Sequence, residues 1–439
     1  MIVFRSSALR ARPRPPRAPL AQRQRAGIAI LMVVTAIALC VVLVNDFSTR
    51  TQVDKLGARN NLDQVRAHFL ARSGLNLADL MLRLQKKVEQ FEETFGPIQI
   101  TTYADTFVAA FGGDEEQVES AVGVSFGETK GMGVSFGTFG LRMTPIDGKI
   151  NVNCAASLAA SNQRIVRSAL QGLLDPNAFD PVFEEEDGEG WRRDRATQID
   201  AIMDYIDKDQ DRGEQRAGAE DYGYENLKDR YKPKNNAIDS VAELKLLRGV
   251  DARFWALFGT AFRTLGACEV NLRVADDPKI LLAVIQLAAK TPEQVDLGNA
   301  WQLAQLWLQA VQLGLVQPTN DEFRGFIADP KAALAPPTGE GATPPTGTGT
   351  TSTPTLTIPL NLVGIELLRD RLNAIAKAGP ARVYEVEVYG EVTRGGALNP
   401  LRRTIRGTWD QEFQMQESRV AKKFPPGKNK GTWLYLREE

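Results

Sequence analysis

An uncharged apolar run near the N-terminus gives the strongest structural signal in this sequence. From Ile28 to Val44 the chain contains no charged residue, and its only polar residue is Thr35. About 17 residues rising about 1.5 Å each are just enough to span the apolar core of a bilayer. The run ends Val-Leu-Val-Asn-Asp-Phe, which lacks the small residues of a signal-peptide cleavage site. We therefore expect a membrane helix that the mature protein keeps.

Charge is distributed asymmetrically about this run. Residues 1–26 contain seven arginines and no acidic residue, although the formal charge of the whole chain is only −1. Arginines before a membrane helix stay in the cytoplasm, so we expect a cytoplasmic N-terminus and a body on the opposite side. Without these arginines the formal charge falls to −8. An acidic body argues against a nucleic-acid surface, which needs clustered positive charge.

The apolar run continues into an amphipathic pattern. No proline occurs between Gly27 and Pro97, and apolar residues recur mostly every three or four positions: Leu62, Val65, Phe69, Leu77, Leu80, Leu84 and Val88. This spacing predicts one long helix from Ile28 to about Phe91, apolar in its first half and amphipathic in its second.

The start of the run resembles the leader of type IV pilin-like subunits. The stretch Gln24-Arg25-Ala26-Gly27-Ile28 has the basic residue, the glycine and the apolar continuation of that leader, which implies cleavage between Gly27 and Ile28. Glycine has no Cβ, so its backbone can lie flat in a protease cleft. Most pilins carry glutamate at the fifth residue after the cut, where this chain has Met32.

The body contains five segments that, as a set, resemble the K-type minor pseudopilin of the bacterial type II secretion system (the general secretion pathway protein K family). That family lacks the fifth-position glutamate and carries a large helical insert within a pilin-like domain. The five segments are Gly148-Lys149-Ile150-Asn151-Val152-Asn153, Asp204-Tyr205-Ile206-Asp207 with Gly218-Ala219-Glu220-Asp221, Ile238-Asp239-Ser240 with Glu243-Leu244, Glu269-Val270-Asn271-Leu272, and Thr432-Trp433-Leu434-Tyr435-Leu436.

The patterning itself predicts strands before residue 155 and after residue 380, with helices between them. Residues 134–143 and 150–153 flank Asp147-Gly148, a dipeptide that favours a hairpin turn. Val383–Val392 and Arg402–Trp409 flank Gly395-Gly396 and predict a second hairpin. Helical spacing covers residues 164–174, 199–206, 241–247, 301–313 and 360–376.

We therefore predict an α+β fold: a pilin-like long N-terminal helix packed on a small antiparallel sheet, with a large all-α domain inserted between sheet strands. The predicted segments are a basic leader (1–27), the transmembrane and amphipathic helix (28–92), the first part of the pilin-like domain (93–154), the helical insert (155–335), a Pro/Gly/Thr-rich linker (336–357) and the C-terminal part of the pilin-like domain (358–439).

An acidic loop is the best candidate for a ligand site. Its carboxylates are Asp207, Asp209, Asp211, Glu220 and Asp221. Oxygens at alternate positions of a loop can converge on Ca²⁺, which takes about six to eight oxygen ligands. Calcium in this insert is also what the family resemblance implies. The spacing is not that of an EF-hand, and a solvated acidic loop is the alternative.

Other polar residues favour structural roles. Asn151, Asn153 and Asn271 are expected to hydrogen-bond backbone at strand ends. Cys154 and Cys268 could pair in an oxidising compartment or remain two buried thiols. The only histidine is His68, in a helical stretch, which argues against Ser-His-Asp and Cys-His catalysis.

The resemblance implies a non-enzymatic subunit that caps the tip of the secretion pseudopilus and supports export of folded proteins. Leu62, Val65 and Phe69 are then expected to pack against partner helices as in a coiled coil. The implied partners are the I- and J-type minor pseudopilins, the major pseudopilin, the prepilin peptidase and the inner membrane, with secreted cargo or the outer-membrane secretin as further contacts and no nucleic acid. A tip pilin of a type IV pilus is the closest alternative.

A membrane-anchored DNA-uptake receptor is the alternative from another class. Residues 238–258 resemble a helix-hairpin-helix, but the turn Arg248-Gly249-Val250-Asp251 has a single glycine and an acid. DNA-binding versions present a second glycine and backbone amides to phosphate, so a packing module is favoured.

Overall fold

The computed structural model describes residues 20–91, 100–104, 108, 136–184, 194–208, 224, 231–334, 359, 362–393, 400–411 and 431–439. The chain divides into two units, residues 1–66 and 67–439, with the boundary inside the first helix. The predicted linker, residues 336–357, lies outside the described residues.

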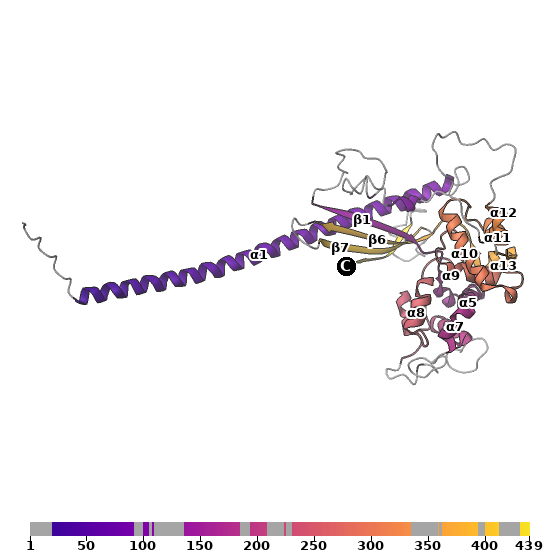
Figure 1. Ribbon diagram of the computed structural model, residues 1–439, viewed down its shortest axis with the longest axis horizontal. Coiled ribbons are helices and arrows are strands. Elements are labelled where there is room, and N and C mark those ends of the chain that lie inside the picture. Colours follow the sequence, from indigo (N-terminus) through magenta and orange to yellow (C-terminus); the bar gives the residue numbers. More distant parts are fainter. Residues whose placement is uncertain are drawn as a thin grey trace, which may run out of the picture. The chain divides into compact units, whose positions relative to one another are not determined.

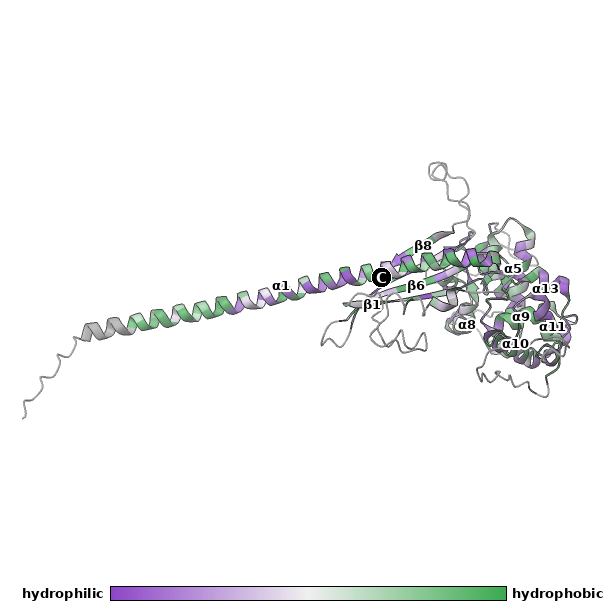
Figure 2. Ribbon diagram, turned by 90° about the horizontal axis from the view of Figure 1, so that it is seen from above, coloured by the Kyte–Doolittle hydropathy of each residue, from purple (hydrophilic) through white to green (hydrophobic). Residues whose placement is uncertain are grey.

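Helix α1 runs without interruption over Leu20–Val88 and is followed by the 3₁₀ turn η1, Glu89–Phe91. The continuous helix expected from the apolar and amphipathic patterns is confirmed. From Ile28 to Arg59 every residue is exposed, and the green stretch of α1 in Figure 2 marks its apolar part. By length and composition, α1 is the one helix of the described chain that could cross a membrane.

In the second unit a four-stranded antiparallel sheet has the order β1-β6-β7-β8. Its strands are β1 Gly137–Pro145, β6 Val383–Val392, β7 Leu401–Asp410 and β8 Thr432–Glu438. Strands β6 and β7 form the hairpin expected across Gly395-Gly396. Figure 1 shows β1, β6 and β7 side by side along the C-terminal part of α1.

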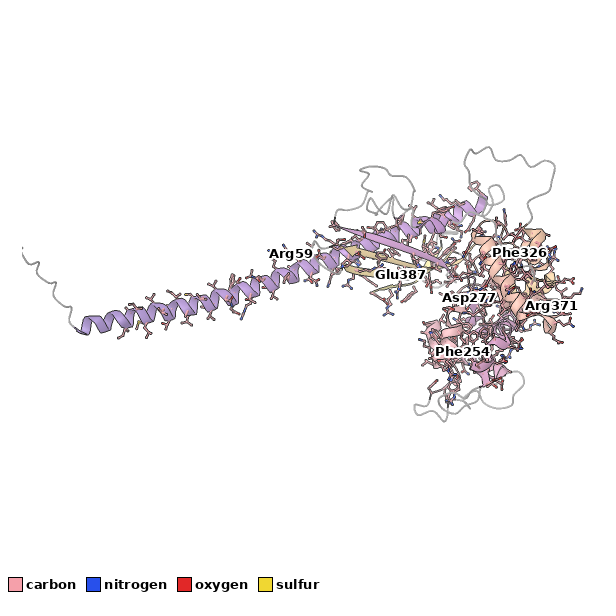
Figure 3. All side chains as sticks on the ribbon, in the orientation of Figure 1. Arg59, Phe254, Asp277, Phe326, Arg371 and Glu387 are labelled. Carbon is pink, nitrogen blue, oxygen red and sulfur yellow. A yellow bond between two sulfur atoms is a disulfide. The ribbon has the colours of Figure 1, made fainter. Side chains whose placement is uncertain are left out.

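Alternation along the strands gives the sheet one apolar and one charged face. Tyr384, Val386 and Val388 of β6 are buried in a core shared with α1 residues such as Ala78 and Met81. The helix lies close to the sheet at its small residues: a Cβ on Gly74 would lie 2.4 Å from Val388, and one on Gly390 would lie 2.1 Å from the Ala67 carbonyl. Glu387 of β6, labelled in Figure 3, points to the opposite face and pairs with Arg406 at 3.1 Å.

A large helical region is inserted between β1 and β6. Its longer helices are α5 Ala160–Leu174, α7 Arg195–Ile206, α8 Ala252–Phe258, α9 Pro278–Ala288, α10 Leu297–Gln312, α11 Asn320–Ala328 and α13 Arg369–Ile375. Short helical pieces in this region are η3 Val152–Ala156, η4 Asn177–Phe179, α6 Asp180–Glu184, η6 Val241–Leu246, η7 Gly259–Ala261, η8 Pro292–Gln294 and α12 Pro330–Ala333. One more, η2 Ile100–Tyr103, lies before β1.

This region has its own apolar core, in which Trp307, Phe254 and Phe326 are fully buried (the two phenylalanines are labelled in Figure 3). It also contains two short parallel ladders. Strand β2 Ile150–Asn151 pairs with β3 Phe262–Arg263, and β4 Val270–Asn271 pairs with β5 Ala376–Lys377. The predicted α+β class with a helical insert is confirmed, with four two-residue strands added to the insert.

Two local predictions are wrong. Asp147-Gly148 does not turn a hairpin: β1 pairs with β6 along its whole length, and β2 pairs elsewhere. Helical spacing over 360–376 yields a helix only at α13, because Asn299 holds Val363 in a non-helical stretch through hydrogen bonds to both its backbone N–H (3.0 Å) and its C=O (2.5 Å).

Candidate assembly and metal-binding sites

The predicted cleavage point lies inside α1. Gly27 and Ile28 are both helical, and the Ile28 side chain is exposed. Cleavage between them stays a prediction.

The predicted contact residues on α1 are all on the surface. Leu62 and Val65 in the first unit are 49% and 52% exposed, and Phe69 in the second unit is 62% exposed. Ala67, Ala71 and Ala78, by contrast, are fully buried against the sheet. Large apolar side chains on the surface of a soluble domain often mark contacts with other molecules. The three residues are therefore available for a partner, and their packing stays a prediction.

Only one of the five predicted calcium ligands can be placed. Asp207 ends α7, where its backbone N–H donates to the Met203 carbonyl at 2.9 Å. Asp209, Asp211, Glu220 and Asp221 lie outside the described residues. Within the described part of the chain, no three His, Cys, Asp or Glu side chains gather as a metal site would require. The calcium prediction thus rests on the sequence and on one carboxylate at the start of the loop.

A buried ion pair that sequence reasoning missed joins the helical region to the sheet. Arg263 is 2% exposed and contacts Asp147 at 3.0 Å. Burial lowers the pKa of Arg263 while the Asp147 carboxylate opposes this shift, and a guanidinium stays charged in proteins. The other Asp147 oxygen accepts hydrogen bonds from the backbone amides of Arg382 and Val383, where β6 begins.

The remaining Arg263 donors reach backbone carbonyls. They donate to the carbonyls of Lys149 at 2.8 Å, Leu265 at 2.5 Å, Ala267 at 2.7 Å and Glu269 at 3.3 Å. Gly266 has φ of +96°, and a Cβ there would lie 2.1 Å from the guanidinium. The surroundings of Asp147-Gly148 explain why this dipeptide does not form a hairpin turn. Asp147 is a buried hydrogen-bond acceptor, and Gly148 packs so closely that a Cβ on it would lie 2.4 Å from the Ala275 Cα.

The predicted structural role of the asparagines is confirmed. Asn151 donates to the Gly266 carbonyl at 2.8 Å, and Asn271 donates to the Gly379 carbonyl at 3.0 Å. Asn153 accepts from the Ile238 N–H and donates to its C=O, both at 2.8 Å. Each amide fixes backbone that is distant in sequence, which satisfies polar groups that burial would otherwise leave unpaired.

The two body cysteines are bonded. Cys154 and Cys268 form a disulfide across a sequence separation of 114 residues, and it ties η3 to the segment that precedes β4. The alternative of two buried thiols is excluded in this structure. Cys40 is free and exposed.

The helix-hairpin-helix-like segment is built as a packing module. Ser240 and Glu243 form a capping box at the start of η6. Burial alone would raise the pKa of Glu243, but hydrogen bonds from Lys234 and from the Asp239 and Ser240 amides lower it overall. At α8, Asp251 caps the helix by accepting from the Phe254 N–H at 2.8 Å. The Asp251 carboxylate thus accepts from the backbone N–H at the helix N-terminus, where a DNA phosphate would otherwise bind.

The helical region is similar in sequence to a known protein family. Residues 148–258, about a quarter of the chain, match the family model of type II secretion system (T2SS), protein K. Among solved structures, the crystal structure of the GspK-GspI-GspJ complex from enterotoxigenic Escherichia coli is similar at 13% identity and a TM-score of 0.46, covering 87% of this chain and 99% of that chain. No curated protein sequence matches.

The fold thus defines a pilin-like α+β protein with a helical insert. Over residues 148–258 the chain is similar to protein K of the type II secretion system, which confirms the resemblance drawn from the sequence motifs. The matched range contains the first three of the five motif segments.

Proposed function

We propose that this chain is a K-type minor pseudopilin that caps the type II secretion pseudopilus and serves export without catalysing a reaction. The observation that carries the proposal is the protein K match on the insert of a pilin-like sheet. The uninterrupted α1, apolar where it would enter the membrane, supports it independently.

In this proposal the N-terminus is cytoplasmic, α1 anchors the chain in the inner membrane, and the body is periplasmic. Leu62, Val65 and Phe69 pack against the helices of I- and J-type partners and of the major pseudopilin. The bulky insert and Met32, which replaces the usual glutamate, both suit a tip position, since no further subunit needs to stack above it. Cargo or the secretin would meet the insert.

Cleavage after Gly27 is the decisive test. We expect N-terminal sequencing of the native protein to begin at Ile28, and Gly27→Ala to leave the 27-residue leader attached and abolish secretion. Gly57→Ala is the matched control, because Gly57 lies in the same helix with nothing within 4 Å of its missing Cβ. Mature-size protein in the Gly27→Ala strain would contradict the assignment.

We also propose that the loop beginning at Asp207 binds calcium and thereby fixes the insert. If several carboxylates of the loop coordinate one calcium ion, binding of the metal is coupled to folding of the loop. Titration calorimetry on the full chain in detergent should give saturable calcium binding, weakened by about tenfold or more in Asp209→Ala/Asp211→Ala. Glu366→Ala removes an exposed carboxylate elsewhere and should leave binding unchanged. Absence of both heat and thermal stabilisation at millimolar calcium would exclude the site.

A further inference from the structure

Strand β8 is the last strand of the sheet, and its chemistry is unusual for an edge. It reads Thr-Trp-Leu-Tyr-Leu-Arg-Glu, with Tyr435 49% and Leu436 48% exposed. No described strand pairs with its outer side. Proteins usually guard edge strands with charges, proline or a cover, because an open edge invites another strand. Apart from its last two residues, β8 has no charged residue and no proline.

Backbone geometry identifies the groups that face outward. Thr404 and Glu439 exchange both N–H···O=C bonds, at 3.1 and 2.8 Å. In an antiparallel pair such bonded positions alternate with non-bonded ones. The register places Leu436 opposite Gly407 and Glu438 opposite Ile405, which are the non-bonded positions. The N–H and C=O groups of Leu436 and Glu438 therefore point away from β7.

Helix α1 supplies a cation next to this edge. His68 Nδ1 lies 2.6 Å from Glu438 Oε1, and Lys86 Nζ donates to the Gln411 carbonyl at 2.9 Å, where β7 ends. α1 and β8 thus run in opposite directions (Figure 2 shows them adjacent). Arg72 lies one turn beyond His68 on the same flank, about 6 Å along the helix and level with Leu436. Arg72 is exposed, and no described carboxylate lies within ion-pair distance of it.

We propose that the open edge of β8 binds an extended segment of a neighbouring pilin-like subunit, apolar at its centre and carrying an acidic residue opposite Arg72. Backbone bonds to Leu436 and Glu438 would extend the sheet by one strand, and Arg72 would select the register through its charge. This inference rests on the proposed function, which places one copy of the chain beside different subunits and so favours a different subunit over a second copy as occupant.

Photo-cross-linking in cells tests the contact. With p-benzoylphenylalanine in place of Tyr435 in the full chain, irradiation should give an adduct. The cross-linked peptide should map to an acid-containing strand of a protein with a prepilin-type leader. The same probe at Leu158, which is 92% exposed in the loop before α5, is the positional control and should not trap that peptide.

Two substitutions test the geometry. Leu436→Pro removes an outward N–H without removing a bond to β7, so the adduct should be lost, whereas Leu436→Ala should retain it. Arg72→Glu should reduce the adduct severalfold, while Arg83→Glu, next to Asp79 on the same helix, should not. If thermal melting shows that Leu436→Pro does not fold, Leu436→Lys serves as the edge-blocking variant.

The outcomes separate this inference from the proposed function. A probe at Phe69 reports helix packing alone. An adduct from Phe69 but none from Tyr435 would overturn the edge-strand contact and leave the proposed function standing. Adducts from neither position would overturn both. A Tyr435 adduct with this chain itself, or with a second copy of it, would also overturn the contact with a neighbouring subunit.

Discussion

Among single residues, the Asp147–Arg263 pair is the contact that joins the helical region to the four-stranded sheet. One carboxylate oxygen of Asp147 pairs with the Arg263 guanidinium. The other accepts hydrogen bonds from the backbone N–H groups at the start of β6. Arg263 also donates to four backbone carbonyls of the surrounding loops. Every polar atom of the pair therefore contributes to holding β3 and the loops around it against the start of β6.

Removal of the cation should cost much of the stability of this unit. Arg263→Ala leaves a buried carboxylate unpaired and several carbonyls without donors, which costs about 3–5 kcal/mol in comparable buried pairs. Domains are stable by only about 5–15 kcal/mol, so the urea midpoint followed by tryptophan fluorescence should fall markedly. Arg406→Ala, which breaks an exposed pair with Glu387, is the control and should leave the midpoint nearly unchanged. Equal midpoints for the two variants would contradict this role.

The residue scale also shows what sequence can predict. Asn151, Asn153 and Asn271 follow short β-like runs, and amide side chains at strand ends commonly satisfy nearby backbone, so their role was predictable. Their partners were not, because each lies more than 80 positions away. Arg263 carried no local signal, since a single arginine among apolar residues predicts a solvated side chain unless its distant acceptor is known.

For helices and strands, the sequence pattern predicts an element correctly when the segment that it pairs with is close in the sequence. α1 and the pairing of β6 with β7 were predictable because their periodicities and the Gly395-Gly396 dipeptide lie within one segment of the sequence. The Asp147-Gly148 hairpin failed because β1 pairs with β6, more than 200 positions away, and the turn dipeptide serves a buried ion pair instead. Tertiary contact here overrides turn preference.

The candidate sites also differ in how much of each could be predicted from the sequence. Helical periodicity places Leu62, Val65 and Phe69 on one side of α1. It does not decide whether that side meets the sheet or solvent, and in the structure the neighbouring small residues are the ones that are buried. The open edge of β8 could not be predicted, because edge position depends on strand order and not on the sequence of the strand itself. For the calcium loop, the sequence supplies the carboxylates, while the convergence of their oxygens depends on residues outside the described part of the chain.

At the scale of the whole molecule, the disulfide constrains where the body can reside. Cys154 and Cys268 close a loop with a sequence separation of 114 residues, which encloses α5 to α8. Closing so long a loop restricts the unfolded chain strongly, and removal of such a bond commonly costs about 2–4 kcal/mol. Such bonds persist in oxidising compartments such as the periplasm and are rare in the cytosol. The bond therefore supports the proposed sidedness independently of the arginine-rich N-terminus.

Thiol counting tests this sidedness. Protein released from the membrane into denaturant without reductant should react with one equivalent of maleimide-polyethylene glycol, at Cys40, and with three equivalents after reduction. Cys40→Ser should abolish the first reaction and leave the thermal midpoint of the body unchanged. Cys154→Ser/Cys268→Ser should lower the count in the reduced sample from three equivalents to one and leave the unreduced count at one. The double substitution should also lower the midpoint, because the unfolded chain regains the freedom that the bond removed. Three reactive thiols in the unreduced native protein would place the body in a reducing compartment, and the periplasmic assignment would then be wrong even if Gly27 is cleaved.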